Sequence, residues 1–179
     1  MKIFKYLGIA LLALIALTLI AATFVSGDMN YEKSVVIDAS IEAVWENVNS
    51  LSDMDKWSPW DKKDPGMKKE FTGRDGTVGA KSCWESERED VGKGCQTIAN
   101  LEPPNLIETD LKFYTPYESE AKGYIRLVEE DGKTIATWGF SSTLPYPFRI
   151  MNLFMDMEIV MGEDFSYGVN TLKSLSEWN

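Results

Sequence analysis

Residues 148–178 read FRIMNLFMDMEIVMGEDFSYGVNTLKSLSEW, and they predict a long C-terminal helical region. Apolar side chains recur along it every three or four residues, as on one face of a helix: Phe154, Met157, Met161, Phe165, Val169, Leu172 and Leu175. We expect an interruption near Asp156 or Gly162. A stripe of this length needs a wide apolar surface to cover, and a β-sheet provides one.

The residues before this region predict that sheet, because the apolar period changes to two from Met67 onward. We expect strands at 68–72, 80–87, 92–101, 106–114, 121–129 and 134–142. Apolar and polar residues alternate most clearly from Leu106 to Tyr114, which indicates a strand with one buried face and one face exposed to solvent. Short turns separate the strands, so consecutive strands should pair antiparallel.

A further strand and two short helices are expected still earlier in the chain. Residues 31–38 are rich in β-branched side chains, which favour a strand. Ser40 can cap a helix that begins at Ile41, and a second short helix is expected near 51–56. The segments 57–60 and 61–65 are interpreted as loops, the latter ending in a turn signal.

This order of elements predicts an α+β domain with a helix-grip architecture. A curved antiparallel sheet of about seven strands would wrap around the long C-terminal helix. Side chains do not fill such a curved space completely. We therefore expect a cavity that opens near the short helices.

The N-terminus predicts a single membrane-spanning helix. Tyr6–Val25 carries no charge, and its 20 residues would span about 30 Å, the thickness of the hydrocarbon core. Lys2 and Lys5 precede it, so the N-terminus should stay in the cytoplasm and the domain should lie outside, on the periplasmic face in a bacterium. The alternative is a cleaved signal peptide, with Val25-Ser26-Gly27 as the cleavage site. We assign 1–27 to the membrane anchor and 28–179 to the ligand-binding domain.

Composition excludes several kinds of chemistry. The chain has a net charge of −10, and without Lys2 and Lys5 its 18 basic side chains become 16 against 28 acidic ones, a net charge of −12. This charge disfavours binding to nucleic acid. The chain has no histidine, which excludes Ser-His-Asp and Cys-His catalysis, and its two cysteines alone cannot form a structural zinc site. We therefore predict no metal, no cofactor and no catalytic residue.

Short motifs, each weak alone, follow one another in an informative order. They are Val35-Val36-Ile37-Asp38-Ala39-Ser40, Val44-Trp45, Trp57-Ser58-Pro59-Trp60, Gly76-Thr77-Val78-Gly79-Ala80, Trp84-Glu85-Ser86, Val91-Gly92-Lys93-Gly94 and Met161-Gly162-Glu163-Asp164-Phe165. Together they resemble the START and Bet v 1-like superfamily, and within it the bacterial polyketide cyclase/dehydrase and lipid-transport branch. The resemblance spans about 31–175. It implies the helix-grip fold and a hydrophobic pocket, and it implies no shared catalytic residues.

Aromatic and methionine side chains are the candidates for the pocket lining. We select Trp57, Trp60, Trp84, Phe113, Trp138, Met151, Phe154 and Met155. Tryptophan can stack on a flat ligand, and methionine adapts to an irregular one. Each of these side chains could instead fill the core between sheet and helix.

Cys83 and Cys95 are expected to form a disulfide. If Trp84 points inward, Cys83 points outward, and a hairpin that turns at 88–90 places Cys83 opposite Cys95. A domain outside the cytoplasm would allow the bond to persist.

Three functions remain open from the sequence. We favour a membrane-tethered binding or carrier protein for a small hydrophobic ligand such as a lipid, an isoprenoid or an aromatic metabolite. An enzyme such as a polyketide cyclase or dehydratase is the first alternative. It would need an acid–base pair in the pocket, such as a carboxylate with Tyr114, Tyr117 or Tyr124, and the candidate carboxylates are Asp61, Asp64, Glu70 and Asp75. A protein-interaction module whose cavity is merely structural is the second.

Overall fold

The computed structural model describes residues 2–178, and within them seven strands form one antiparallel sheet. The strands are β1 Asp28–Ile37, β2 Lys68–Thr72, β3 Lys81–Glu85, β4 Lys93–Glu102, β5 Leu106–Thr115, β6 Ser119–Glu130 and β7 Lys133–Thr143. Their spatial order is β1-β7-β6-β5-β4-β3-β2. Each strand from β2 to β6 therefore pairs with the next strand along the chain, and β1 forms the far edge by pairing with β7.

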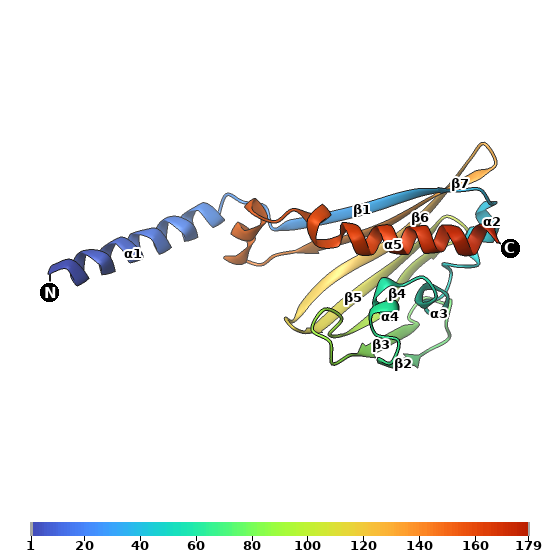
Figure 1. Ribbon diagram of the computed structural model, residues 1–179, viewed down its shortest axis with the longest axis horizontal. Coiled ribbons are helices and arrows are strands. Elements are labelled where there is room, and N and C mark those ends of the chain that lie inside the picture. The colour runs from blue at the N-terminus through green and yellow to red at the C-terminus, as the bar shows by residue number, and fades with distance from the viewer. Residues whose placement is uncertain (1, 179) are drawn as a thin grey trace.

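A long helix, α5 (Met157–Glu177), packs lengthwise against this sheet (Figure 1). Its face carries Phe165, Val169 and Leu172, each at most 3% exposed. Opposite them, Ile37 and Leu127 of the sheet are fully buried. The predicted α+β helix-grip architecture, with its seven antiparallel strands, is confirmed.

Three short helices connect β1 to β2: α2 Ile41–Trp45, α3 Leu51–Asp55 and α4 Pro59–Lys63. Each begins at a serine whose hydroxyl accepts a hydrogen bond from a backbone N–H three residues later; these serines are Ser40, Ser50 and Ser58. The prediction of loops at 57–60 and 61–65 was wrong for α4. Ser58 caps this helix and proline occupies its first position, a combination that favours a helix start.

The C-terminal helical region is divided in two. A 3-10 helix, η1 (Phe148–Leu153), comes first, and α5 follows after a break at 154–156. Asp156 caps α5 by accepting a hydrogen bond from the backbone N–H of Glu158, at 2.9 Å. The expected interruption near Asp156 is present, and η1 is thereby separated from the helix that covers the sheet.

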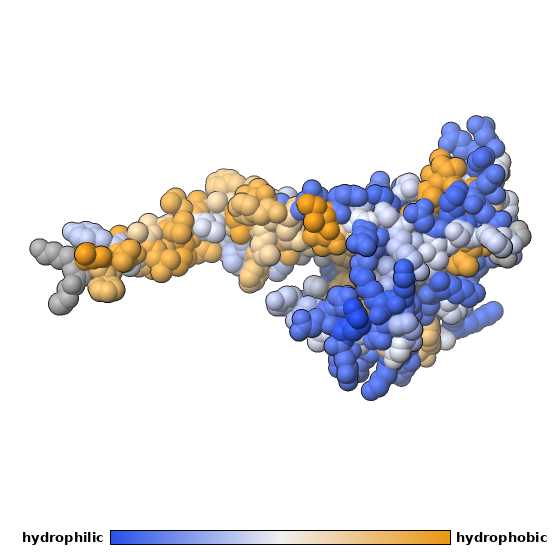
Figure 2. Space-filling view, viewed as in Figure 1, coloured by the Kyte–Doolittle hydropathy of each residue, from blue (hydrophilic) through white to orange (hydrophobic). Residues whose placement is uncertain are grey.

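The N-terminal helix α1 (Lys2–Ala22) projects away from the domain (Figure 1). Residues Ile3–Ala22 are long and apolar enough to cross a membrane, with a mean hydropathy of 2.4, and nearly all of their side chains are exposed. Hydrophobic side chains cover α1 in Figure 2, whereas the opposite end of the molecule is largely hydrophilic. By length and composition, α1 is a candidate membrane span.

Candidate ligand-binding cavity

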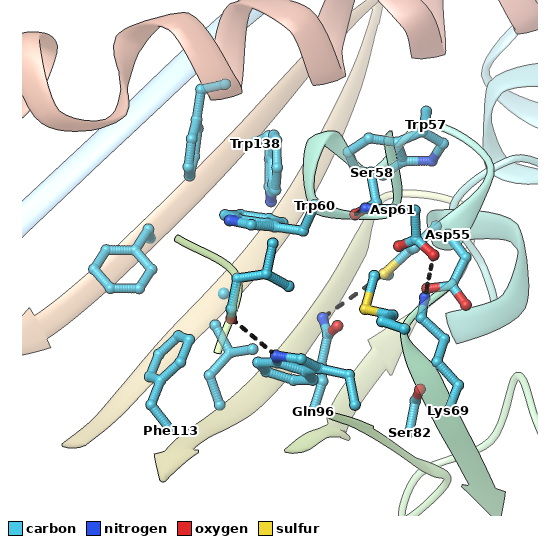
Figure 3. A pocket seen from close by; sticks show the side chains of 18 of the residues that line it. Asp55, Trp57, Ser58, Trp60, Asp61, Lys69, Ser82, Gln96, Phe113 and Trp138 are labelled. Atoms are coloured by element: carbon cyan, nitrogen blue, oxygen red, sulfur yellow. Dashed lines mark hydrogen bonds and ion pairs between the residues drawn. The ribbon is translucent and has the colours of Figure 1, made fainter. Parts of the chain in front are cut away.

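A cavity of about 230 Å³ lies between the sheet, the short helices and α5 (Figure 3). The residues that line it are Met54, Asp55, Trp57, Ser58, Trp60, Asp61, Met67, Lys69, Ser82, Trp84, Val91, Gln96, Leu111, Phe113, Gly123, Trp138, Gly139, Phe140, Met161 and Phe165. The side chains of α3 and α4 lie over the β2–β4 part of the sheet, where α5 does not reach. The cavity is therefore the space left where one helix cannot fill the whole concave surface.

Four tryptophans and three phenylalanines form the aromatic wall of the cavity. Trp138 stacks on Phe165 of α5, with ring centroids 4.0 Å apart. The edges of Trp57 and Trp60 meet Trp138 at centroid distances of 5.0 and 5.7 Å. Edge-to-face and stacked contacts of this kind hold aromatic rings in fixed orientations. The wall is thus held in place by contacts among its own side chains.

The indole N–H groups divide into two kinds. Trp57 donates to the backbone oxygen of Asn47 at 3.0 Å, and Trp84 donates to that of Val91 at 3.3 Å. Among residues 2–178, no acceptor pairs with the indole N–H of Trp60 or Trp138. These last two groups are therefore the indole donors that a guest molecule can use.

One side of the cavity is charged. Lys69 of β2 forms ion pairs with Asp55, at 2.7 Å, and with Asp61, at 2.5 Å. Burial raises the pKa of Asp55, and the neighbouring Lys69 opposes this rise. Two carboxylates share one ammonium group, so this side has a net negative charge when both are ionised.

Uncharged polar groups lie on the sheet between the charged side and the aromatic wall. Gln96 donates from Nε2 to Thr109 Oγ1 at 3.1 Å, which fixes its side chain on the floor of the cavity. The hydroxyl of Ser82, a residue only 6% exposed, also lies at the cavity. The cavity therefore has an apolar body and a polar end.

Five of the eight proposed lining residues lie around this cavity: Trp57, Trp60, Trp84, Phe113 and Trp138. Met151, Phe154 and Met155 do not line it, and the expectation that they would was wrong. They belong to η1 and the break before α5, at the end of the domain next to α1. Phe154 is 86% exposed there. The helical stripe predicted an apolar face but could not show that the helix over the sheet begins only at Met157.

Several lining residues were missed by the sequence reasoning. Phe165 and Met161 belong to the predicted stripe on the C-terminal helix, so that pattern could have identified them. Asp55, Lys69 and Gln96 carried no such signal, because charged and amide side chains usually face water. Asp55 and Lys69 reach the cavity because α3 and α4 fold over β2, and Gln96 reaches it from β4, an inner strand of the sheet.

The other predicted polar residues lie elsewhere. Asp75 accepts hydrogen bonds from the backbone N–H groups of Leu51, at 2.8 Å, and Ser52, at 3.1 Å, and so holds the start of α3. Asp64 pairs with the hydroxyl of Ser86, and Glu70 is exposed on β2. Of the four carboxylates considered for acid–base chemistry, Asp61 alone lines the cavity.

Cys83 and Cys95 form a disulfide between β3 and β4, in the register expected from the hairpin. Cys83 precedes Trp84 on β3, and alternation along the strand places it on the face away from the cavity. The bond therefore joins two strands of the sheet without entering the candidate site. Within residues 2–178, no group of three acidic, cysteine or histidine side chains is placed to hold a metal ion.

No protein-family model and no curated protein sequence matches the chain. Solved structures match it over most of its length. A protein from Thermobifida fusca has a TM-score of 0.60 and 16% sequence identity, covering 82% of this chain and 92% of its own. Ara h 8.0201 has a TM-score of 0.55 and 12% identity, covering 86% of this chain and 100% of its own.

The Aha1 dimer from Colwellia psychrerythraea matches with a TM-score of 0.56 and 15% identity, covering 83% of this chain and 96% of its own. At such identities the similarity concerns the fold. The chain has the fold of the START and Bet v 1-like superfamily, in agreement with the resemblance of its motifs.

Proposed function

We propose that this protein is a membrane-tethered binding or carrier protein for one compact hydrophobic molecule. The observation that carries this proposal is the preorganised cavity of about 230 Å³, walled by Trp57, Trp60, Trp84 and Trp138. Concave, mainly apolar cavities with a few polar groups are the usual form of small-molecule sites. α1 would anchor the domain at the membrane, with the N-terminus in the cytoplasm and the domain outside.

The volume of the cavity indicates which of the proposed classes of ligand would fit inside it. An engineered apolar cavity of about 150 Å³ binds benzene, and pockets for drug-sized ligands begin at about 300 Å³. This cavity lies between the two, so it suits a molecule somewhat larger than benzene. A long acyl or isoprenoid chain would extend beyond it, and we favour an aromatic or alicyclic compound.

The arrangement of polar groups suggests how the ligand would lie. Its apolar ring would stack among the tryptophans, and acceptor atoms on it could meet the free indole N–H groups of Trp60 and Trp138. A hydrogen-bond donor or a cationic group would suit the end formed by Asp55 and Asp61. An anionic ligand would be repelled from that end.

The first test identifies the ligand. The full chain would be taken from its native membrane into lipid nanodiscs, extracted with organic solvent and analysed by mass spectrometry. We expect one compact aromatic or alicyclic compound at close to one molecule per chain. The absence of any such compound, together with no uptake of apolar dyes, would contradict the proposal.

A matched pair of variants makes this test specific to the cavity. Met161→Trp adds a bulky ring to the cavity wall, whereas Glu163→Trp adds the same ring at an exposed position of the same helix. We expect the bound compound to fall at least about tenfold in Met161→Trp and to be unchanged in Glu163→Trp. Equal yields from the two variants would place the ligand elsewhere.

A second candidate function, an enzyme acting on the bound molecule, is favoured by the ion-paired group of Asp55, Asp61 and Lys69. Burial raises the pKa of Asp55, as is common for catalytic acids. The variant Asp55→Asn separates the two functions. A carrier would still retain its ligand unaltered, whereas an enzyme would convert the extracted compound only when Asp55 is present.

A further inference from the structure

The end of the domain next to α1 carries large exposed apolar side chains. Five of them are Phe148, Met151, Leu153, Phe154 and Ile159, each between 48% and 86% exposed. We call this surface the junction face. Figure 2 shows the hydrophobic surface of α1 continuing onto this end of the domain. A contiguous apolar surface of this kind marks a site of interaction with a protein or a membrane.

Contacts hold the junction face at the level of the last turn of α1. The hydroxyl of Tyr146 donates to the backbone oxygen of Leu19 at 3.4 Å. Asn152 of η1 donates from Nδ2 to the backbone oxygens of Ser26, at 3.0 Å, and Asp28, at 3.2 Å. Leu19 lies only about 5 Å along the helix axis from Ala22, where the candidate span ends. If α1 spans a bilayer, η1 must therefore lie at its surface.

Charge distribution distinguishes this surface from the rest of the domain. From Gly139 to Met155 the single charged residue is Arg149, in a domain whose net charge is −12. Two acidic residues follow, but Asp156 caps α5, and Glu158 is directed back to Lys33 at 2.9 Å. Aromatic and aliphatic side chains together with an arginine are typical of segments at the membrane–water boundary.

Arg149 supplies a second and independent observation. Its Nε atom is buried and has no hydrogen-bond partner among residues 2–178. Its guanidinium group lies over the ring of Tyr146, 5.8 Å from the centroid, and forms no ion pair within the same residues. A guanidinium group without an anionic partner is suited to bind a phosphate.

We propose that the junction face is a membrane-docking surface, on which apolar side chains enter the interfacial layer of a phospholipid bilayer and Arg149 binds a lipid phosphate. This inference rests on the proposed tether through α1 and goes beyond it, because it places the domain itself in contact with lipid. The domain would then be held in one orientation and would not move freely on a linker. A bilayer is the expected occupant because this surface adjoins the predicted membrane span.

Two positions with the same exposure provide the test. Met151 on the junction face and Val128 near the β6–β7 turn are both 48% exposed, and the native cysteines are paired in the disulfide. Full-length Met151→Cys and Val128→Cys would each be labelled with a nitroxide under non-reducing conditions and reconstituted into phosphatidylcholine–phosphatidylglycerol vesicles. Electron paramagnetic resonance would then compare the accessibility of each label to oxygen and to a water-soluble nickel chelate.

We expect oxygen to be the better relaxing agent at position 151 and the nickel chelate at position 128. A label at 151 that behaves like the one at 128, in a chain that floats with the vesicles, would overturn the docking surface and leave the tether intact. A chain that does not float with vesicles would overturn both. Ligand extraction reports on the cavity independently of either result.

Arg149 is tested in the labelled Met151→Cys background. Arg149→Gln should reduce the depth of the label in the bilayer. Arg149→Lys, which keeps a positive charge, should leave the label at most of its original depth. An unchanged depth in Arg149→Gln would overturn the assignment of a lipid phosphate to this residue.

Discussion

Trp138 contributes both to the core and to the cavity. Its ring stacks on Phe165, and its far edge approaches Gly168, where an added Cβ would lie 2.5 Å from the indole. The same ring contacts Trp57 and Trp60, which come from the short helices. One side chain on β7 therefore sets the distance to α5 and supports the aromatic wall.

Asp75 is the residue whose charge should matter most clearly for stability. Burial, the largest single effect, raises its pKa, but hydrogen bonds from Ser52, Leu51 and Gly76 together lower it below the usual 3.8. The ionised form is therefore favoured by folding. Its stabilisation is complete above pH 3.8 and is lost as the pH falls through the lower pKa of the folded state.

We expect Asp75→Asn to lower the free energy of unfolding by about 1 kcal/mol at pH 7, as for the loss of a helix cap. The difference from the parent chain should shrink below pH 3.8. Urea unfolding of both chains at pH 7 and pH 3 measures this effect. Glu70→Gln, at an exposed position of β2, serves as the control and should change stability little at either pH.

The close approach of α5 to the sheet depends on a glycine in the helix. Alanine at position 168 would favour an isolated helix by about 1 kcal/mol, but its Cβ would collide with the Trp138 ring. We expect Gly168→Ala to be destabilising by about 1–3 kcal/mol overall, because the packed ring cannot move freely. Thermal unfolding measures this change.

Ser174→Ala, at an exposed position of the same helix, is the control, with an expected change within about 0.5 kcal/mol. A Gly168→Ala chain as stable as the control would show that α5 is not held tightly against Trp138.

The hairpin of β3 and β4 is the element that the disulfide constrains. Cys83 and Cys95 close a loop with a sequence separation of 12. Replacing both with alanine should lower the free energy of unfolding by about 2–4 kcal/mol, because the unfolded chain gains freedom. Dithiothreitol should destabilise the parent chain in urea and leave the double variant unaffected. Equal sensitivity of the two would show that the bond does not contribute.

At the scale of the whole molecule, a hydrophobic helix and a largely hydrophilic domain lie at opposite ends (Figures 1 and 2). Lysines lie in the first turn of this helix and acidic residues follow its end, which favours translocation of the domain. We expect alkaline phosphatase fused after residue 179 to be active in a bacterial host, because this enzyme needs disulfides that form outside the cytoplasm. If the phosphatase fusion is inactive, and a reporter that fluoresces only in the cytoplasm is fluorescent when fused at the same position, the domain lies in the cytoplasm. The proposed orientation would then be reversed.

Helices and strands whose apolar residues recur at the spacing of that element could be predicted from the sequence alone. The alternation from Leu106 to Tyr114 depends only on the geometry of a strand, and the helical stripe depends only on the turn of a helix. The prediction that Cys83 lies opposite Cys95 followed from counting residues outward from the turn of one hairpin. The length and apolarity of α1 likewise identified a candidate membrane span without any tertiary contact.

Tertiary structure alone decided which side chains line the cavity. Phe154 lies in the same predicted apolar stripe as Phe165, but the break at Asp156 leaves it, together with Met151 of η1, next to α1 and away from the sheet. Lys69 lies at the cavity because α3 and α4 fold over β2 and supply Asp55 and Asp61. These contacts join residues from different helices and strands, so no repeating pattern within one segment of the sequence predicts them.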